Sequence, residues 1–181
     1  MIAPAAQVTT RTESYRTGAA MLFLAASVIL GALGFEYIAG QLPCPLCLQQ
    51  RYAYYAGVPM LFGALVLLGA EQSDEKPWAA LLFLAVAFLF LANVGLAAYH
   101  AGVEWKLWEG PATCAVQQPI SNSPSDLLKQ LQNNVPLRCD EASWRFLGLS
   151  LAGWNAVISL VLFFGCLKAA FSAAPHKRSF I

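Results

Sequence analysis

Two of the five cysteines, Cys44 and Cys47, stand two residues apart in the run Pro43-Cys44-Pro45-Leu46-Cys47. This spacing is typical of redox-active dithiols, because the short gap closes a tight ring whose disulfide exchanges readily with other thiols. Such a small ring removes little entropy from the unfolded chain, so a purely stabilising disulfide is disfavoured here. The spacing therefore points to thiol–disulfide exchange.

Arg51 follows Cys47 by four residues, which is about one turn if this segment is helical. The motif lies where the second apolar segment should begin, and the start of a helix stabilises a thiolate through its free N–H groups and its dipole. A fixed positive charge one turn away would favour a Cys47 thiolate further. The alternative for Arg51 is an anchor at the membrane interface.

The other three cysteines differ in kind. Cys114 and Cys139 are separated by 24 mostly polar residues, which predicts a mobile arm carrying a second pair, although structural disulfides that brace the loops remain an alternative. A zinc site built from all four loop cysteines is disfavoured, because a second closely spaced pair is missing. Cys166 stands in an apolar run and is predicted to be a small apolar residue.

The composition indicates where these cysteines are held. Of the 181 residues 58% are hydrophobic and 12% are charged, against about 45–50% and about 25% in soluble domains. Mean hydropathy is +0.55, which is too apolar for a disordered chain. The net charge of +1 and the pI near 7.6 provide no basic field for nucleic acid. We therefore expect an integral membrane protein.

Four charge-free runs cover residues 17–35, 52–70, 77–99 and 146–167 and contain 19, 19, 23 and 22 residues. About 20 apolar residues in a helix cross the hydrocarbon of a bilayer, whereas barrel strands are shorter and alternate. The runs predict an all-α membrane protein with a bundle of four transmembrane helices. The first run also resembles a signal peptide, but it is long for one and lacks a good cleavage site.

Four spans put the tails 1–16 and 168–181 and the connection 71–76 on one side of the membrane. That side holds six Lys and Arg in 36 residues, whereas loops 36–51 and 100–145 hold five in 62. Because cytoplasmic loops are richer in Lys and Arg, we expect both tails to be cytoplasmic. Both cysteine pairs then lie in non-cytoplasmic loops, where disulfides persist.

These features together resemble the DsbB family of disulfide bond formation proteins. The matching parts are the run Pro43–Arg51 at the second span, the pair Cys114 and Cys139 before the fourth span, and the run Trp144–Ser150. The resemblance extends from about residue 18 to about residue 167. It implies a thiol–quinone oxidoreductase of the bacterial inner membrane that needs no metal. Such an enzyme reoxidises DsbA, a periplasmic thioredoxin-fold oxidase, and passes the electrons to ubiquinone or menaquinone.

The resemblance also implies a role for each loop cysteine. Cys44 and Cys47 would form the pair next to the quinone, Cys114 would form the mixed disulfide with the partner, and Cys139 would be its mate in the second loop. Electrons would then pass from the partner to the second pair, to the first pair and finally to quinone.

Two further residues resemble family positions at the quinone, namely Arg51 and His100. Family members often carry an acidic residue just before the arginine, whereas this chain has Gln50. Two alternatives remain open at this point. One is a structural membrane protein whose disulfides brace its outer loops, and the other is a DsbB relative that serves a dedicated partner.

Overall fold

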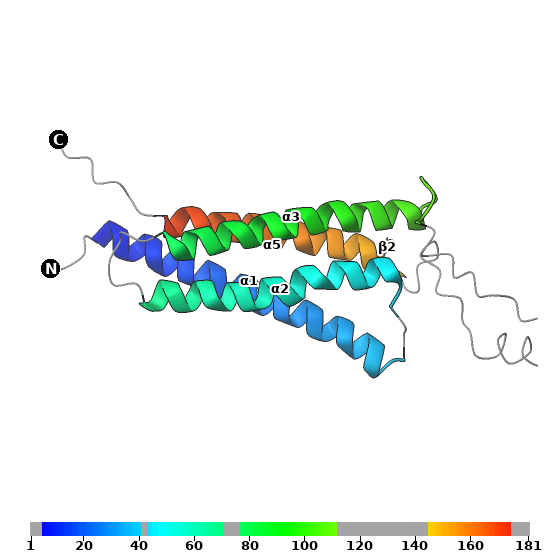
Figure 1. Ribbon diagram of the computed structural model, residues 1–181, viewed down its shortest axis with the longest axis horizontal. Helices are drawn as coiled ribbons and strands as arrows, with labels where there is room; N and C mark the ends of the chain where they lie inside the picture. The colour runs from blue at the N-terminus through cyan, green and yellow to red at the C-terminus, as the bar shows by residue number, and fades with distance from the viewer. Residues whose placement is uncertain (1–4, 41–42, 71–76, 112–144, 175–181) are drawn as a thin grey trace, which may run out of the picture.

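A computed structural model of the chain describes residues 5–40, 43–70, 77–111 and 145–174. In these residues the chain forms four long helices that lie side by side (Figure 1). They are α1 (Ala5–Tyr37), α2 (Pro45–Ala70), α3 (Trp78–Glu104) and α5 (Leu151–Ala173). The predicted all-α bundle of four helices is confirmed. Cys114 and Cys139 lie outside the described residues.

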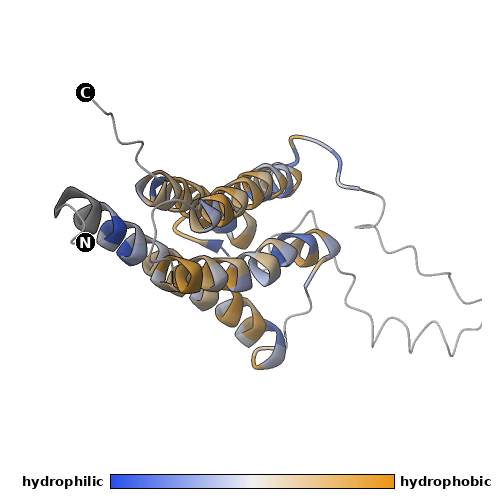
Figure 2. Ribbon diagram, turned by 60° about the vertical axis from the view of Figure 1, so that its left-hand side comes forward, coloured by the Kyte–Doolittle hydropathy of each residue, from blue (hydrophilic) through white to orange (hydrophobic). Residues whose placement is uncertain are grey.

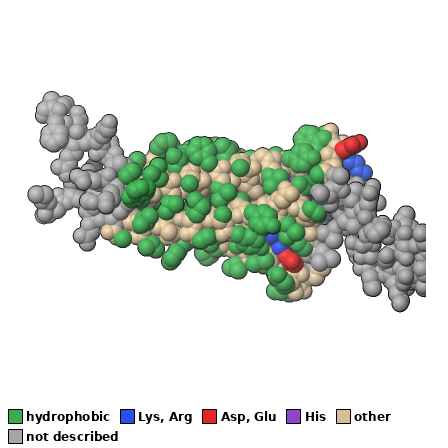
Figure 3. Space-filling view, in the orientation of Figure 1, with side chains coloured by type: hydrophobic (Ala, Val, Ile, Leu, Met, Phe, Trp, Pro, Cys, Tyr) green, Lys and Arg blue, Asp and Glu red, His purple; other side chains and the backbone are tan. Residues whose placement is uncertain are grey.

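Each helix is long and apolar enough to cross a membrane. The four candidate spans have 23 to 28 residues, with mean hydropathies between 1.7 and 2.5, and a span of 23 residues is already about 35 Å long. Hydrophobic residues line the helices (Figure 2), and hydrophobic side chains are spread along the whole face of the bundle in Figure 3. Large apolar side chains such as Phe23 and Phe171 are more than two-thirds exposed. Such a surface suits lipid and would be a liability in water.

The helices do not end where the charge-free runs end. α2 begins seven residues before its predicted span, with Pro45 at its first position, where a missing N–H costs nothing. α3 runs five residues further than expected, to Glu104. Charged residues at these ends are accommodated within the helices, so counting charges underestimates helix length.

α5 instead begins five residues later than its predicted span. Strands β1 (Arg145–Phe146) and β2 (Leu149–Ser150) pair antiparallel just before it. The two residues of their turn, Leu147 and Gly148, both have positive φ, as a tight hairpin turn requires. Ser150 then caps α5, its hydroxyl accepting the N–H of Gly153 at 3.1 Å.

Helix packing places the core between all four helices. α1 and α3 each pack against both α2 and α5, around fully buried side chains such as Phe83, Phe90 and Leu162. Glycines allow this approach: a Cβ atom on Gly18 would come within 2.7 Å of the Phe83 ring. Small residues at helix contacts are typical of membrane bundles, where close packing drives association.

The helices alternate in direction along the bundle. α1 and α3 end at the same end of the bundle at which α2 and α5 begin (Figure 1). We call this the cysteine end, because Cys44 and Cys47 stand at the start of α2. The arrangement brings the last turns of α3 beside the first turn of α2.

Candidate active site

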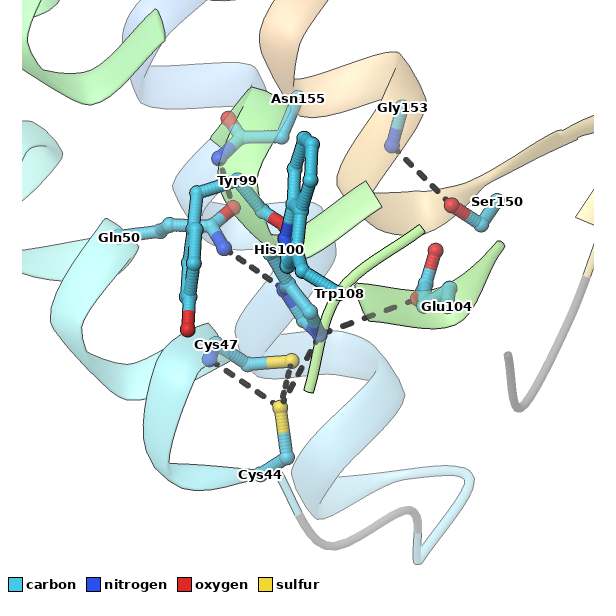
Figure 4. Close-up of polar contacts among 10 residues, drawn as sticks. All are labelled: Cys44, Cys47, Gln50, Tyr99, His100, Glu104, Trp108, Ser150, Gly153 and Asn155. Atoms are coloured by element: carbon cyan, nitrogen blue, oxygen red, sulfur yellow. Dashed lines mark hydrogen bonds and ion pairs between the residues drawn. The ribbon is translucent and has the colours of Figure 1, made fainter. Parts of the chain in front are cut away.

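The first turn of α2 holds the two closely spaced cysteines together. Cys44 directly precedes the helix and its carbonyl accepts the N–H of Leu48 at 3.0 Å. The Cys44 sulfur also accepts the backbone N–H of Cys47 at 3.2 Å, and the two sulfurs lie 2.6 Å apart (Figure 4). Cys44 is buried and Cys47 is partly exposed. The fold therefore gives this pair the proximity that disulfide exchange requires.

His100, from the last turns of α3, completes a three-residue cluster with this pair. Its Nε2 atom lies 3.7 Å from the Cys44 sulfur, and the residue is 2% exposed. One turn further on, Glu104 places Oε1 3.8 Å from the same nitrogen. Leu46 and Val103 pack with Cys44 in a small apolar cluster, which fixes the start of α2 against the end of α3.

The surroundings of Cys44 lower the pKa of its thiol to about 5. The largest cause is the hydrogen bond from Cys47, with further contributions from the His100 side chain and the Cys47 N–H, and together these outweigh the effect of burial. The sulfur that collects the hydrogen-bond donors is therefore Cys44, whereas the spacing to Arg51 favoured a Cys47 thiolate. These donors favour the thiolate at Cys44 when the pair is reduced.

Arg51 makes its contacts with α1. Its guanidinium hydrogen-bonds to the carboxylate of Glu36 and, at 3.1 Å, to the carbonyl oxygen of Ala32. The side chain is 12% exposed and connects the second turn of α2 to the end of α1. Arg51 thus stands near the cysteine pair as expected, with its charge balanced by a carboxylate that sequence reasoning did not include.

A set of buried and partly buried polar side chains behind His100 was not predicted from the sequence. Gln50 contacts His100 Nδ1 at 2.8 Å and also accepts a hydrogen bond from Asn155 of α5. The Tyr54 hydroxyl donates to Asn155 Oδ1 at 2.5 Å. A signal was available, because an uncharged polar residue such as Asn155 within an apolar span is costly unless it is hydrogen-bonded. The spans were defined by the absence of charged residues, so uncharged polar residues within them were not considered.

The cluster also has the donor set of a metal site. The ligand atoms of Cys44, Cys47 and His100 lie within 4.8 Å of one another, and thiolate with imidazole suits soft or borderline metal ions. A metal and a disulfide exclude each other at this pair, because a metal requires thiolates. The other two cysteines of the zinc alternative, Cys114 and Cys139, lie outside the described residues.

Cys166 stands apart from this site. It is fully buried in the apolar core of the bundle, in the same cluster as Leu162 and Ala169. A thiol in such surroundings acts as a small apolar side chain, which is the role expected from the sequence.

The fold and the site define a class of protein: a multi-pass membrane protein with a dithiol at the start of its second helix. The family model for disulfide bond formation protein DsbB matches residues 15–169. This chain therefore belongs to the DsbB family, whose members are four-helix membrane proteins that act in disulfide bond formation.

Individual relatives agree with this assignment. The chain is 32% identical over 139 residues to disulfide bond formation protein B 1 of Pseudomonas fluorescens, which covers 75% of this chain and 76% of the relative. It is 31% identical over 171 residues to disulfide bond formation protein B of Aromatoleum aromaticum, covering 87% and 96%. No solved structure matches the chain.

Proposed function

We propose that this protein is a thiol–quinone oxidoreductase of the bacterial inner membrane. It reoxidises a periplasmic thioredoxin-fold dithiol oxidase similar to DsbA and passes the electrons to ubiquinone or menaquinone. The observation that carries the proposal is the Cys44–Cys47 pair, with sulfurs 2.6 Å apart at the end of a membrane-spanning helix and His100 beside Cys44. A lipid-dissolved quinone reaches such a position without leaving the bilayer.

The first half of the reaction oxidises the partner and transfers its two electrons to the cysteines of this protein. A thiolate of the partner attacks Cys114 of the Cys114–Cys139 disulfide, which forms a mixed disulfide and releases Cys139 as thiolate. Cys139 then attacks Cys44 of the Cys44–Cys47 disulfide and releases Cys47 as thiolate. The partner's second thiolate attacks the mixed disulfide, so the partner leaves oxidised and Cys114 is freed.

The second half restores both disulfides. Cys114 attacks Cys139, which re-forms their disulfide and releases Cys44 as thiolate. Cys44 and Cys47 are now both reduced, and they hold the two electrons that the partner lost. When bound, a quinone accepts these two electrons with two protons and leaves as quinol, while the Cys44–Cys47 disulfide forms again.

The side chains around the pair fit such an acceptor. Cys47 is the more exposed residue of the pair, and we assign the electron transfer to it. Arg51 on α2 and His100 on α3 carry N–H groups of the kind that binds carbonyl oxygens. As charge builds on Cys47 and on its acceptor, the guanidinium of Arg51 stabilises it. The bundle supplies an apolar surface at the same end.

The decisive experiment uses the purified full-length protein in detergent or lipid. A reduced thioredoxin-fold dithiol and ubiquinone are added, and the quinone absorbance and the thiol content are followed together. We expect one quinone to be reduced for each dithiol oxidised, and no turnover with Cys44→Ser. Two static disulfides and no quinone reduction would instead identify a structural protein. Comparing several dithiol partners separates a general enzyme from one with a dedicated partner.

A further inference from the structure

A row of hydrogen-bonded side chains leads from Cys44 into the bundle. The proposed reaction gives a role to His100 but none to the residues behind it. Behind His100 the row contains Gln50 and Tyr54 of α2 and Asn155 of α5 (Figure 4 draws Gln50, His100 and Asn155). His100, Gln50 and Tyr54 are each at most 5% exposed. An unpaired polar group at such depth costs about 1–3 kcal/mol, so each donor and acceptor in the row is constrained by its neighbours.

The direction of the hydrogen bonds can be followed from Tyr54, whose hydroxyl also contacts Ser159 at 3.4 Å. The hydroxyl of Tyr54 donates to Asn155 Oδ1, so the NH₂ group of Asn155 faces Gln50. Asn155 Nδ2 donates to Gln50 Oε1, and this turns the NH₂ group of Gln50 towards His100. An amide nitrogen donates and does not accept. With the two amides in this orientation, Nδ1 of His100, 2.8 Å away, is the nitrogen without a proton.

A neutral imidazole with an unprotonated Nδ1 carries its hydrogen on Nε2. That nitrogen is the one that lies 3.7 Å from the Cys44 sulfur. Among the described residues, Glu104 Oε1 is a second acceptor near the same nitrogen, at 3.8 Å. The tautomer thus decides whether His100 offers Cys44 a donor or a lone pair.

We propose that Gln50, held by Asn155 and Tyr54, is a positioning residue that keeps His100 in the tautomer with its proton on Nε2, so that the imidazole donates this N–H to the Cys44 sulfur. The consequence for catalysis rests on the proposed function: Cys44 is the leaving thiolate when Cys114 attacks Cys139, and a hydrogen bond to a leaving thiolate speeds its departure. The amide of Gln50 donates to Nδ1 and so favours the proton on Nε2, whereas a carboxylate at this position would accept from Nδ1 and favour the opposite tautomer.

The tautomer can be measured without any partner or quinone. The chain has two histidines, His100 and His176, so the His176→Gln variant, labelled with ¹⁵N-histidine, reports on His100 alone. In the reduced full-length protein in lipid, the ¹⁵N shifts should place the proton on Nε2. Gln50→Glu has the same shape but accepts instead of donating, so it should move the proton to Nδ1. A proton on Nδ1 in the parent, or no change in Gln50→Glu, overturns the proposal.

Two further variants separate positioning from general stability. Asn155→Leu leaves the Gln50 amide without its donor, so the His100 tautomers should become mixed. Ser14→Ala is the matched control, because Ser14 is fully buried but donates to the carbonyl oxygen of Ala169 at 2.8 Å, away from this row. It should leave the tautomer unchanged, and a tautomer scrambled equally by Ser14→Ala overturns the proposal.

Turnover gives the second readout. Gln50→Leu should lower the rate of thiol-dependent quinone reduction by about threefold or more, with unchanged formation of the mixed disulfide at Cys114, because it weakens one hydrogen bond to a charged sulfur. If the parent reduces no quinone, the proposed function fails while the measured tautomer still decides the role of Gln50. If the tautomer follows Gln50 but turnover does not, Gln50 does not position His100 for the reaction.

Discussion

The guanidinium of Arg51 on α2 pairs with the carboxylate of Glu36 on α1. The contact joins the start of the second helix to the end of the first, next to the cysteine pair. An arginine that only anchors a helix end needs this carboxylate partner, whereas one that acts on a quinone needs its own guanidinium and not the partner. The two roles therefore predict different results when each partner is changed.

Arg51→Ala should raise the apparent KM for quinone about tenfold or more, since a charge-assisted contact is worth about 1.5–3 kcal/mol. Arg51→Lys should have a smaller effect, because it keeps the charge but loses the planar fork. The control is Glu36→Gln, which breaks the same ion pair and leaves the guanidinium charged. Its quinone KM should stay close to that of the parent.

Quinone kinetics and trapping of the mixed disulfide at Cys114 are measured side by side for these variants. Disulfide exchange with the partner takes place at another pair, so it should persist in all of them. If Arg51→Ala and Glu36→Gln raise KM equally, or if Arg51→Ala blocks the mixed disulfide, Arg51 is an interfacial anchor and nothing more.

Changing either cysteine of the closely spaced pair should abolish quinone reduction. Cys44→Ser and Cys47→Ser each leave a single sulfur, which cannot form the disulfide that accepts two electrons. The matched control is Cys166→Ala, which removes a thiol buried in the apolar core and should keep most activity. Stopped-flow quinone absorbance with a reduced dithiol partner provides the comparison. Near-normal turnover in either serine variant would rule out this pair as the electron donor.

The rate at which Cys44 is alkylated should rise with pH, with a midpoint well below that of a free cysteine. Its pKa is lowered to about 5, so the thiolate predominates above that pH and decreases tenfold for each unit below it. A free cysteine would titrate near 8.5. A variant that retains only Cys44 and Cys47 is reduced and treated with iodoacetamide from pH 4 to pH 9, and the modified residue is identified by mass. A midpoint above pH 8 would contradict the hydrogen bonding described for the Cys44 sulfur.

Membrane orientation is tested independently of the chemistry. Lys and Arg density predicts that both termini are cytoplasmic and that Cys114 and Cys139 lie outside. Tags at each end should therefore be protected in spheroplasts, whereas an impermeant maleimide should label both cysteines after reduction. A C-terminal tag accessible only from the outside would invert the topology, and with it the argument that the loops lie in an oxidising compartment.

Much of this protein follows from its sequence alone. The charge-free runs predict the four helices, because a run of about 20 apolar residues has the length of a helix that crosses the hydrocarbon of a bilayer. The Cys44–Cys47 spacing identified the dithiol, and its place at the start of α2 followed from where the apolar run begins. These properties depend on residues near one another in the chain, so short-range patterns are enough to reveal them.

Tertiary structure decided which side chains surround that dithiol. His100 meets Cys44 across 56 positions of sequence, and Gln50 meets Asn155 across 105. The guanidinium of Arg51 contacts Glu36 of the first helix, and hydrogen-bond donors near Cys44 lower the pKa of its thiol. Hydropathy shows that helices exist but not which face of each meets its neighbours. That is settled by packing, through glycines that let the helices approach and buried polar groups that must find partners.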